Sequence, residues 1–369
     1  MDIISIIVPT YKEASNIPIL SEKIDNAMKE AGMFYEIVVI DDDSNDGIIE
    51  AVDKIEQKYN IKLKIRKGEK GLSSAVIAGF GIAVGEIIVV MDADLSHPPE
   101  KITELITPIL NGHYDFVVGS RFVEGGSVSH FNWYRKLNAW VSKMLARPFT
   151  KITDPMAGFF AFNRRILIPA IELNPLGFKI GLELMVKASP QKILEIPIQF
   201  QERLHGESKL SLKEQLNYLF HLKRLFEYKY KTTAEFIKFC LIGSSGMIVD
   251  LTFVFISMQI FSNLVIIPQL FRFRIARVIG FVFALTSNFL LNRRFTFAKA
   301  HIGHIYRQYV LFFIVSLIGF GVNWSISVYL HENTVFFNTH YLVAALMGII
   351  AGTLINFTGS KFIVFNHKG

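Results

Sequence analysis

Four apolar segments in the carboxyl-terminal third of the chain constrain its fold more than any other feature. They cover residues 236–261, 273–291, 309–330 and 341–359. Each is close to the roughly 20 residues that an α-helix needs to span the hydrocarbon core of a bilayer. The connections between them are short and predict two helical hairpins. We therefore expect a four-helix transmembrane domain over residues 233–369.

The rest of the chain has a different composition. Hydrophobic residues make up 51% of the 369 residues, yet charged residues still reach 19% because they are concentrated in the first two-thirds. This length is sufficient for two domains, each with its own core. The net charge of +7 comes largely from Lys and Arg that flank apolar stretches. This pattern predicts contact with the anionic surface of a lipid bilayer and no binding of nucleic acid.

The two predicted hairpins resemble each other weakly but in order. Residues 236–239, with Gly243 and Gly246, correspond to residues 309–312, with Gly319 and Gly321. Residues 287–289 and 295–297 correspond to residues 355–357 and 362–365. An ordered correspondence of this kind indicates an internal repeat. The single cysteine, Cys240, lies within the first apolar segment and can form no intrachain disulfide.

Basic residues are distributed unequally between the two ends of the apolar segments. Eleven flank one side, whereas Arg272, Arg274 and Arg277 flank the other. The excess of positive charge predicts a multi-pass membrane protein whose first domain and both termini are cytoplasmic. The amino terminus has no basic region and too short an apolar run for a signal peptide, in agreement with this topology. The eleven are Lys223, Arg224, Lys229, Lys231, Lys238, Arg293, Arg294, Lys299, Arg307, Lys361 and Lys368.

Residues 1–210 show a different pattern, in which short β-rich runs alternate with helical periodicity. The candidate strands are residues 3–9, 36–41, 62–66, 86–92 and 116–119. Such alternation is typical of βαβ units. We therefore predict an α/β domain with a doubly wound, mostly parallel sheet.

Two further segments have the mixture of apolar and basic residues that is expected at a membrane interface. Residues 211–232 predict an interfacial amphipathic helix between the two domains. Residues 131–150 form a second candidate, because Trp133 and Trp140 lie among four cations at helical spacing. The alternative for residues 131–150 is a helix docked on the protein core.

Acidic residues follow two of the predicted strands. In a doubly wound sheet, ligands bind beyond the carboxyl ends of the strands. Residues 41–44 read Asp-Asp-Asp-Ser and could accept hydrogen bonds from a base or ribose, or could in part cap a helix. Asp92 and Asp94 follow the strand over residues 86–91 and project to the same side, because side chains alternate along an extended chain. Two such carboxylates suit Mg²⁺ or Mn²⁺ that is also bound by water and substrate phosphates.

The first strand is followed by Pro9, Thr10, Tyr11, Lys12 and Glu13. This segment lacks the Gly-x-Gly-x-x-Gly pattern of dinucleotide-binding proteins. This absence argues against a dehydrogenase. The segment over residues 8–13, together with residues 38–44, 71–75 and 91–99, resembles the glycosyltransferase family 2 pattern. With residues 119–121, 154–159 and 203–209 added, the chain more narrowly resembles the dolichyl-phosphate mannose synthases, which implies a GT-A fold. The carboxyl-terminal part is similar to the four-helix GtrA-like domain.

The resemblance implies transfer of mannose from GDP-mannose to dolichyl phosphate with inversion at the sugar carbon. It also implies roles for particular residues. Asp94, Arg121 and Arg135 would take part in the transfer, the two arginines by facing the acceptor phosphate. Family members often have Gln where this chain has Ser96, and the shorter hydroxyl would reach the metal through water. The residues implied in binding the donor and its metal are Pro9, Tyr11, Glu13, Ile40, Asp42, Asp92, Ala93, Asp94, Ser96, Lys179, Arg203 and Lys209.

Several of these residues also have simpler interpretations. Arg203 and Lys209 could contact lipid head groups, and Arg135 could reach the membrane surface from an interfacial helix. Tyr11 could be a core residue. Glu183, on an apolar helical stretch, is interpreted as structural.

The sequence leaves two other functions open. One is transfer of glucose from UDP-glucose to a polyprenyl phosphate. The other is a flippase role for the membrane domain, since Asp250, Asn288, Asn323 and Asn356 lie within its spans. Such residues can equally hold helices together. A processive polymer synthase is disfavoured because the chain lacks a Gln-x-x-Arg-Trp motif.

Overall fold

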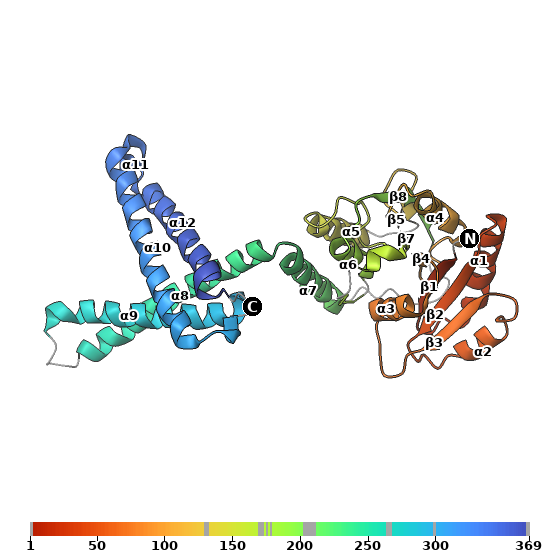
Figure 1. Ribbon diagram of the computed structural model, residues 1–369, viewed down its shortest axis with the longest axis horizontal. Helices are drawn as coiled ribbons and strands as arrows, with labels where there is room; N and C mark the ends of the chain where they lie inside the picture. The colour runs from red at the N-terminus through yellow and green to blue at the C-terminus, as the bar shows by residue number, and fades with distance from the viewer. Residues whose placement is uncertain are drawn as a thin grey trace. The chain divides into compact units, whose positions relative to one another are not determined.

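The computed structural model describes residues 3–128, 133–168, 173–174, 176–177, 179–201, 212–262, 268–297 and 300–366. The chain forms two compact units, Met1–Lys229 and Tyr230–Gly369. The first unit contains a large β-sheet, and the second contains the long apolar helices (Figure 1).

A seven-stranded sheet forms the centre of the first unit, with the strand order β3-β2-β1-β4-β7-β5-β8. Every pairing is parallel except those of β7, which runs antiparallel to both β4 and β5. The prediction of an α/β domain with a mostly parallel sheet is therefore confirmed. The strands are β1 (Ile4–Thr10), β2 (Tyr35–Asp41), β3 (Ile61–Ile65), β4 (Ile87–Val90), β5 (Phe116–Ser120), β7 (Phe160–Asn163) and β8 (Ile193–Pro197). A small second sheet pairs β6 (Ser127–Val128) with β9 (Gln199–Phe200).

The five predicted strands correspond to β1 through β5, whereas β7 and β8 were not predicted. β7 has only four residues and is followed by a 3-10 turn, Arg164–Leu167, in place of a long helix. It therefore lacks the βαβ periodicity on which the prediction relied. β8 lies at the edge of the sheet and is only partly buried, so its apolar pattern is weak.

Helices cover the sheet and bury a core of aliphatic side chains against it. Because β1 lies between β2 and β4 and is parallel to both, the carboxyl ends of the three strands lie at one edge of the sheet. Most of the site residues that were predicted from the sequence lie at this edge. The helices of the first unit are α1 (Ile17–Glu30), α2 (Ile48–Asp53), α3 (Leu72–Ile82), α4 (Ile102–Leu110), α5 (Trp133–Ala146), α6 (Ile180–Lys187) and α7 (Leu212–Lys229).

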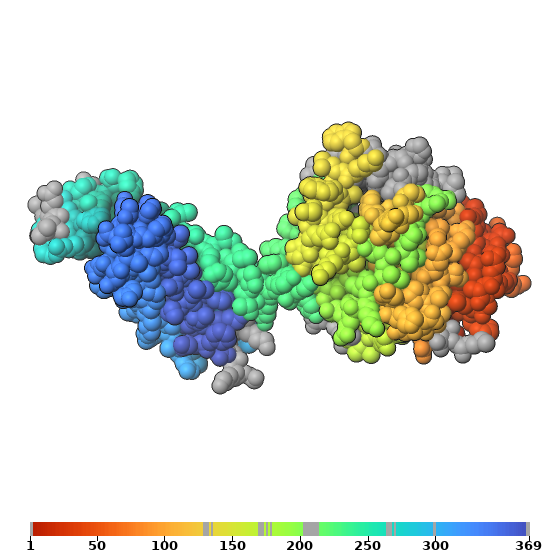
Figure 2. All heavy atoms as spheres, turned by 90° about the horizontal axis from the view of Figure 1, so that it is seen from above, coloured from red at the N-terminus to blue at the C-terminus, as the bar shows by residue number. Residues whose placement is uncertain are grey.

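Helix α5 lies at the surface of the first unit and exposes large apolar side chains there (Figure 2, yellow). Trp133 is 75% exposed and Trp140 is 59% exposed, and Leu137 and Met144 lie on the same helical face. An exposed stripe of this kind marks a surface that binds a membrane or a partner. The finding supports the interfacial interpretation of residues 131–150, which stays a proposal.

Helix α7 has one face packed within the first unit and one apolar face exposed. Tyr218 and Leu225 are buried, and the Tyr218 hydroxyl donates a hydrogen bond to the Ser142 carbonyl at 2.8 Å. Leu219 and Phe220 are exposed. This division suits a helix that is attached to the soluble unit and presents its other side to an apolar surface.

In the described part of the second unit, four helices are long and apolar enough to span a membrane, and they coincide with the four predicted spans. Helix α8 packs against α9, and α10 packs against α12, so the predicted hairpins are present. The helices are α8 (Lys231–Ser262), α9 (Gln269–Leu291), α10 (Ile305–Asn333), the short α11 (Val335–Thr339) and α12 (Tyr341–Gly359).

The internal repeat of the sequence recurs in the packing of the two hairpins. Asn288 lies against Gly246 in the first hairpin, and Asn356 lies against Gly319 in the second. Each asparagine is followed by a π-helical turn, which extends over Asn292–Thr296 in the first hairpin and Ser360–Val364 in the second. The two hairpins are therefore built in the same way.

Aromatic side chains join the hairpins in a reciprocal arrangement. Phe236 of the first hairpin contacts Phe357 of the second edge to face, with ring centroids 5.1 Å apart. At the corresponding positions, Tyr309 of the second hairpin contacts Phe289 of the first at 5.2 Å, again edge to face. The two contacts thus join equivalent positions of the two hairpins.

Polar side chains of the spans also lie at helix contacts. Asp250 forms an ion pair with Arg277 at 2.5 Å, and Gly280 lies against Asp250. At the corresponding positions of the second hairpin, Gly348 lies against Asn323. These contacts favour the interpretation that the polar residues hold helices together.

The asparagine–glycine contacts predict the effect of small substitutions. A Cβ built on Gly319 would overlap the Asn356 amide, whereas one on Gly321 would meet nothing within 4 Å. We expect Gly319→Ala to destabilise the second unit by about 1–3 kcal/mol through overpacking, and Gly321→Ala to cause no loss. Thermal unfolding in detergent measures both. Gly246→Ala and its control Gly243→Ala repeat the comparison in the first hairpin, and equal behaviour within each pair would contradict the prediction.

Candidate active site

The carboxyl ends of β1, β2 and β4 bring most of the predicted site residues to one edge of the sheet. Thr10 at the end of β1 pairs with Asp41 at the end of β2, and Ile7 pairs with Val90 at the end of β4. The predicted residues at this edge are Pro9, Tyr11, Glu13, Ile40, Asp42, Asp92, Ala93, Asp94 and Ser96. Their proximity follows from the parallel register of the three strands.

A tight turn after β4 fixes the carboxylate of Asp94. Leu95 adopts a left-handed backbone conformation with φ of 61°, which is uncommon for a residue other than glycine. The turn allows Ser96 to donate twice to the same Asp94 oxygen, from its backbone N–H at 3.1 Å and from its hydroxyl at 2.5 Å. Asp94 is 5% exposed and Ser96 is fully buried. Ser96 thus lies in contact with Asp94, and its ligation of a metal stays a prediction.

Asp92 is the more exposed carboxylate, and His97 holds its backbone. The Asp92 N–H donates to His97 Nδ1 at 3.2 Å. The His97 ring stacks on Phe159 and contacts Phe200 edge to face. His97 belongs to the motif over residues 91–99, but the sequence alone indicates no role for it. Its buried position identifies it as a support for the Asp92 turn.

The chemistry around Asp92 fits a divalent cation. Gly158 packs beside this carboxylate, since a Cβ built on it would lie 3.4 and 3.6 Å from the two Asp92 carboxylate oxygens. Carboxylate oxygens are hard donors that suit Mg²⁺ and Mn²⁺. The described residues include no group of three or more His, Cys, Asp or Glu side chains that could hold a metal. A Mg²⁺ or Mn²⁺ ion held by one or two carboxylates usually takes its other ligands from water and substrate phosphates.

Arg121, which follows β5, is held by a buried carboxylate. Its Nε donates to Asp154 Oδ2 at 2.7 Å and its Nη2 donates to Oδ1 at 2.9 Å. Asp154 is 1% exposed, and its backbone N–H donates to Glu195 on β8 at 3.0 Å. Burial acts to lower the pKa of Arg121, but the hydrogen bonds that it donates to Asp154 and the charges of Asp154 and Asp92 outweigh burial and raise the pKa, so the guanidinium stays cationic. The sequence did not reveal Asp154 or Glu195 as partners of Arg121.

Lys179, at the start of α6, belongs to the same electrostatic cluster. Burial, and then the positive charge of Arg121, lower the pKa of Lys179 to about 7, against the opposing charges of Asp154, Glu214 and Asp92. Its ammonium group lies 5.8 Å from the centre of the Tyr218 ring. The lysine therefore titrates near neutral pH.

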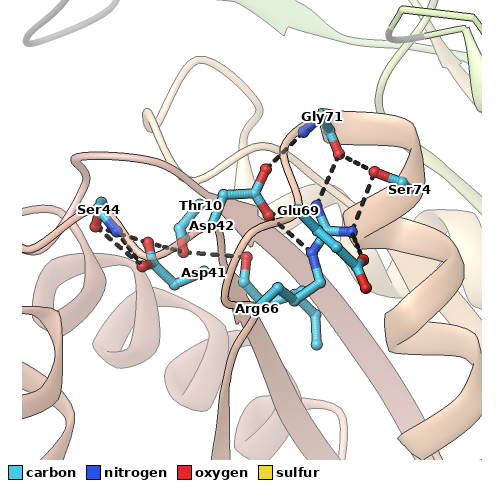
Figure 3. A network of polar contacts seen from close by, with 9 residues as sticks. Thr10, Asp41, Asp42, Ser44, Arg66, Glu69, Gly71 and Ser74 are labelled. Atoms are coloured by element: carbon cyan, nitrogen blue, oxygen red, sulfur yellow. Dashed lines mark hydrogen bonds and ion pairs between the residues drawn. The ribbon is translucent and has the colours of Figure 1, made fainter.

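The acidic residues after β2 have different environments. Asp41 is fully buried and accepts hydrogen bonds from the Ser44 backbone and hydroxyl and from the Thr10 hydroxyl. Asp41 therefore fixes the turn after β2. It does not cap a helix, as the alternative interpretation of this motif expected, because the N-cap of α2 is Gly47, without a side-chain hydrogen bond. Asp42 instead pairs with Arg66, which follows β3 (Figure 3). The sequence analysis did not single out Arg66.

Tyr11 is 40% exposed, so the interpretation as a core residue is wrong. The ammonium groups of Lys12 and Lys70 lie 5.7 and 5.6 Å from the centre of its ring. Glu13 accepts a hydrogen bond from the Asn16 side chain at 2.6 Å, immediately before α1. Pro9, Ile40 and Ala93 are buried and can contribute backbone groups and packing.

Three predicted site residues cannot be placed. Arg203 and Lys209 lie outside the residues that the structure describes, as does the side chain of Arg135 on α5. Glu183 is buried, forms an ion pair with Lys187 at 2.6 Å and accepts a backbone hydrogen bond from Asn174. These contacts agree with the structural interpretation of Glu183.

Comparison with known proteins relates both parts of the chain to characterised families. Residues 5–169 match the family model for glycosyl transferase family 2, and residues 238–365 match the GtrA/DPMS transmembrane domain. The chain is 38% identical to a dolichol-phosphate mannosyltransferase of Pyrococcus furiosus over 370 residues, or 99% of this chain and 98% of the relative. It is 37% identical to the Saccharomyces cerevisiae dolichol-phosphate mannosyltransferase over 260 residues, or 68% of this chain and 92% of that relative.

Proposed function

Because the chain belongs to the dolichol-phosphate mannosyltransferase family and transfers mannose to dolichyl phosphate, we propose that its donor is GDP-mannose and that a divalent cation assists the transfer. The observation that carries the proposal is the pair of carboxylates after β4. Asp94 is fixed by Ser96, and Asp92 precedes it by two residues and lies beside Gly158. When bound there, Mg²⁺ or Mn²⁺ would neutralise charge on the departing diphosphate.

The donor nucleoside is assigned to the ends of β1 and β2. The exposed ring of Tyr11 offers a surface for the base or ribose, and Asp42 offers an acceptor for their N–H or O–H groups. Pro9, Glu13 and Ile40 would complete this pocket, and Ala93 would lie beside the diphosphate. We assign Arg203 and Lys209 to the same diphosphate on the basis of the family motif.

The acceptor is assigned to the side of Arg121. Its Nε and Nη2 are bound to Asp154, which leaves both N–H groups of Nη1 without a hydrogen bond to any described residue. A guanidinium fork held in this way suits the oxygens of a phosphate. Arg135, on the exposed helix α5, is the second residue proposed to face this phosphate.

The transfer needs no general base. The second pKa of a phosphate monoester is about 6, so the acceptor oxygen is already anionic at neutral pH. The protein has to align that oxygen with the anomeric carbon and stabilise the leaving diphosphate. Arg121 and Arg135 would orient the nucleophile, and Arg203 and Lys209 would contact the leaving group. Attack from the opposite face inverts the anomeric carbon, as the family resemblance implies.

The second unit makes this enzyme a membrane protein, and its sequence supports a specific topology. We propose that the first unit and both termini lie in the cytoplasm, because basic residues are concentrated on that side of the spans. We also propose that α5 and the segment 211–232 contact the bilayer surface. A lipid acceptor would then reach Arg121 from the membrane.

The proposed donor can be tested by offering labelled sugars to membranes that contain the full chain. We expect transfer from GDP-mannose to dolichyl phosphate, and little transfer from UDP-glucose. The alternative donor, UDP-glucose, would be supported by glucose transfer without mannose transfer, and that result would refute the proposal.

The family resemblance implies Lys179 in donor binding. Because its charge also interacts with that of Arg121, we propose that Lys179 belongs to the acceptor side as well, and its pKa then predicts the pH dependence of acceptor use. With a pKa of about 7, it is protonated below pH 7 and loses its charge above that pH. Since kcat/KM reports groups of the free enzyme, we expect kcat/KM for dolichyl phosphate to fall by up to about tenfold per pH unit above pH 7. The acceptor phosphate is already ionised in this range and cannot cause the decline.

Lys179→Arg provides the control, because a guanidinium stays protonated throughout this range. Its kcat/KM profile should be flat between pH 7 and 9. A flat profile in the unmodified enzyme would contradict the assignment of Lys179 as a cation of the acceptor side.

A further inference from the structure

Arg66 is a buried arginine that pairs with Asp42, one of the residues assigned to the donor. It immediately follows β3, and its side chain is 3% exposed. All three nitrogens of its guanidinium donate hydrogen bonds (Figure 3). Nε and Nη2 both donate to Asp42 Oδ1, Nη1 donates to Glu69 and Ser74, and Nη2 also donates to the Gly71 carbonyl.

The network fixes Gly71 through both of its backbone polar groups. The Gly71 N–H donates to Asp42 Oδ2 at 2.7 Å, and the Gly71 carbonyl accepts from Arg66 at 3.2 Å. Gly71 has a φ of 135°, a conformation that a residue with a Cβ rarely adopts. The segment that leads from β3 to α3 is therefore tied to the end of β2 at one point.

The position of Gly71 also affects the residues beside the Tyr11 ring. Lys70 directly precedes Gly71, and its ammonium group lies 5.6 Å from the centre of the exposed Tyr11 ring. A change in the position of Gly71 would move Lys70 relative to Tyr11. Arg66 thus connects the two residues that are assigned to the donor nucleoside, Asp42 and Tyr11.

Most hydrogen-bond acceptor positions of the Asp42 carboxylate are occupied within the protein. A carboxylate has about four acceptor positions. Arg66 occupies two on Oδ1, and the Gly71 N–H occupies one on Oδ2. Among the described residues nothing else donates to Asp42, so one acceptor position on Oδ2 remains for a ligand N–H or O–H. The direction of that position is set by the orientation in which Arg66 holds the carboxylate.

Stability alone does not require an arginine at this position. A buried ion pair is often no more stabilising than apolar residues of similar volume. A lysine would supply the same charge, but only a guanidinium offers a planar fork that can hold Asp42 and reach Glu69, Ser74 and Gly71 as well. The geometry of the arginine is therefore its distinctive contribution.

We propose that Arg66 is a positioning residue for the nucleotide-sugar donor, which orients Asp42 and ties segment 67–71 to it. The proposal rests on the proposed function in one respect, the assignment of Asp42 to the donor pocket. Arg66 itself is not expected to touch the donor.

Arg66→Lys in the full chain, purified in detergent, tests this role. We expect the KM for GDP-mannose and the Kd for GDP, measured by calorimetry, to rise about 10- to 100-fold, as misplacement of a binding group would cause. The KM for dolichyl phosphate should stay unchanged. Arg164→Lys is the matched control, because Arg164 also donates to buried backbone groups, the Gly85 and Ala83 carbonyls, but at the amino end of β4.

A milder variant keeps the test informative if Arg66→Lys does not fold. Ser74→Ala removes one contact of Arg66, at 3.1 Å, and the hydrogen bond that the Ser74 hydroxyl donates to the Gly71 carbonyl at 2.8 Å, and it leaves no buried charge unpaired. We expect a smaller rise in the same two donor constants. The proposal would be overturned if the KM for GDP-mannose and the Kd for GDP were unchanged in a folded Arg66→Lys and in Ser74→Ala. It would also be overturned if the KM values for GDP-mannose and dolichyl phosphate rose equally in Arg66→Lys and Arg164→Lys showed the same rise.

The same measurements separate this proposal from the proposed function. If the unmodified enzyme neither binds GDP nor uses GDP-mannose, the proposed donor is wrong. The same variants are then compared with UDP and UDP-glucose. The positioning role is then judged by whether Arg66→Lys weakens binding of that nucleotide selectively.

Discussion

Replacing Asp94 with Asn is expected to lower mannosyl transfer about 10³-fold while leaving the fold intact. Asn has the same shape, and its side-chain oxygen can still accept the two hydrogen bonds that Ser96 donates. The negative charge is lost, and with it the affinity for a divalent cation. Loss of several kcal/mol of charge stabilisation at the leaving group corresponds to about three orders of magnitude in rate.

The measurement is transfer of labelled mannose to dolichyl phosphate, with and without EDTA. The unmodified enzyme should lose activity in the chelator and regain it with Mg²⁺ or Mn²⁺. Asp43→Asn is a matched control, because Asp43 is exposed and belongs to the neighbouring acidic motif after β2. We expect its activity to stay within about twofold. Transfer that is insensitive to the chelator would refute the metal assignment.

The positions of Asp92 and Asp94 could be predicted because they depend on local pattern. An apolar run predicted β4, and the end of that run predicted the position of the two carboxylates that follow it. Parallel neighbouring strands place their carboxyl ends at one edge of a sheet, where ligands bind. The same logic located the ends of β1 and β2. The four spans were predictable for a similar reason, since twenty consecutive apolar residues have few other places in a structure.

The partners of these residues could not be predicted in the same way. Asp41 and Asp42 are adjacent and chemically identical, yet Asp41 caps its own turn through Ser44, and Asp42 pairs with Arg66. Arg66 is 24 residues away in the sequence. Asp154 is 33 residues from Arg121. No local periodicity encodes such pairings, which arise when the sheet assembles.

The antiparallel strand β7 illustrates the same limit and matters for the site. It separates β4 from β5, so it lies between the strand that leads to Asp92 and the strand that leads to Arg121. From the sequence, only the family resemblance placed these two residues in one site. The sheet order supports the proposal that the donor side and the acceptor side are formed by strands on either side of β7.

Arg121→Ala is expected to lower kcat/KM for dolichyl phosphate about 10²- to 10³-fold, with a much smaller effect on the KM for GDP-mannose. The substitution removes the proposed phosphate ligand and leaves Asp154, which is 1% exposed, without its guanidinium partner. Truncating one member of a buried, hydrogen-bonded charge pair costs about 2–5 kcal/mol. The unpaired charge should therefore also lower thermal stability.

Arg121→Lys separates the two contributions, because it keeps a positive charge beside Asp154 but loses the fork that binds Asp154 and a phosphate together. We expect stability close to that of the unmodified enzyme and kcat/KM for the acceptor still reduced about tenfold or more. Arg165→Lys is the control, because Arg165 pairs with Asp115 at 2.9 Å in an exposed position. Surface pairs contribute at most about 1 kcal/mol, so this control should retain acceptor use. If Arg121→Lys instead raised the KM for GDP-mannose and left that for dolichyl phosphate unchanged, Arg121 would belong to the donor side.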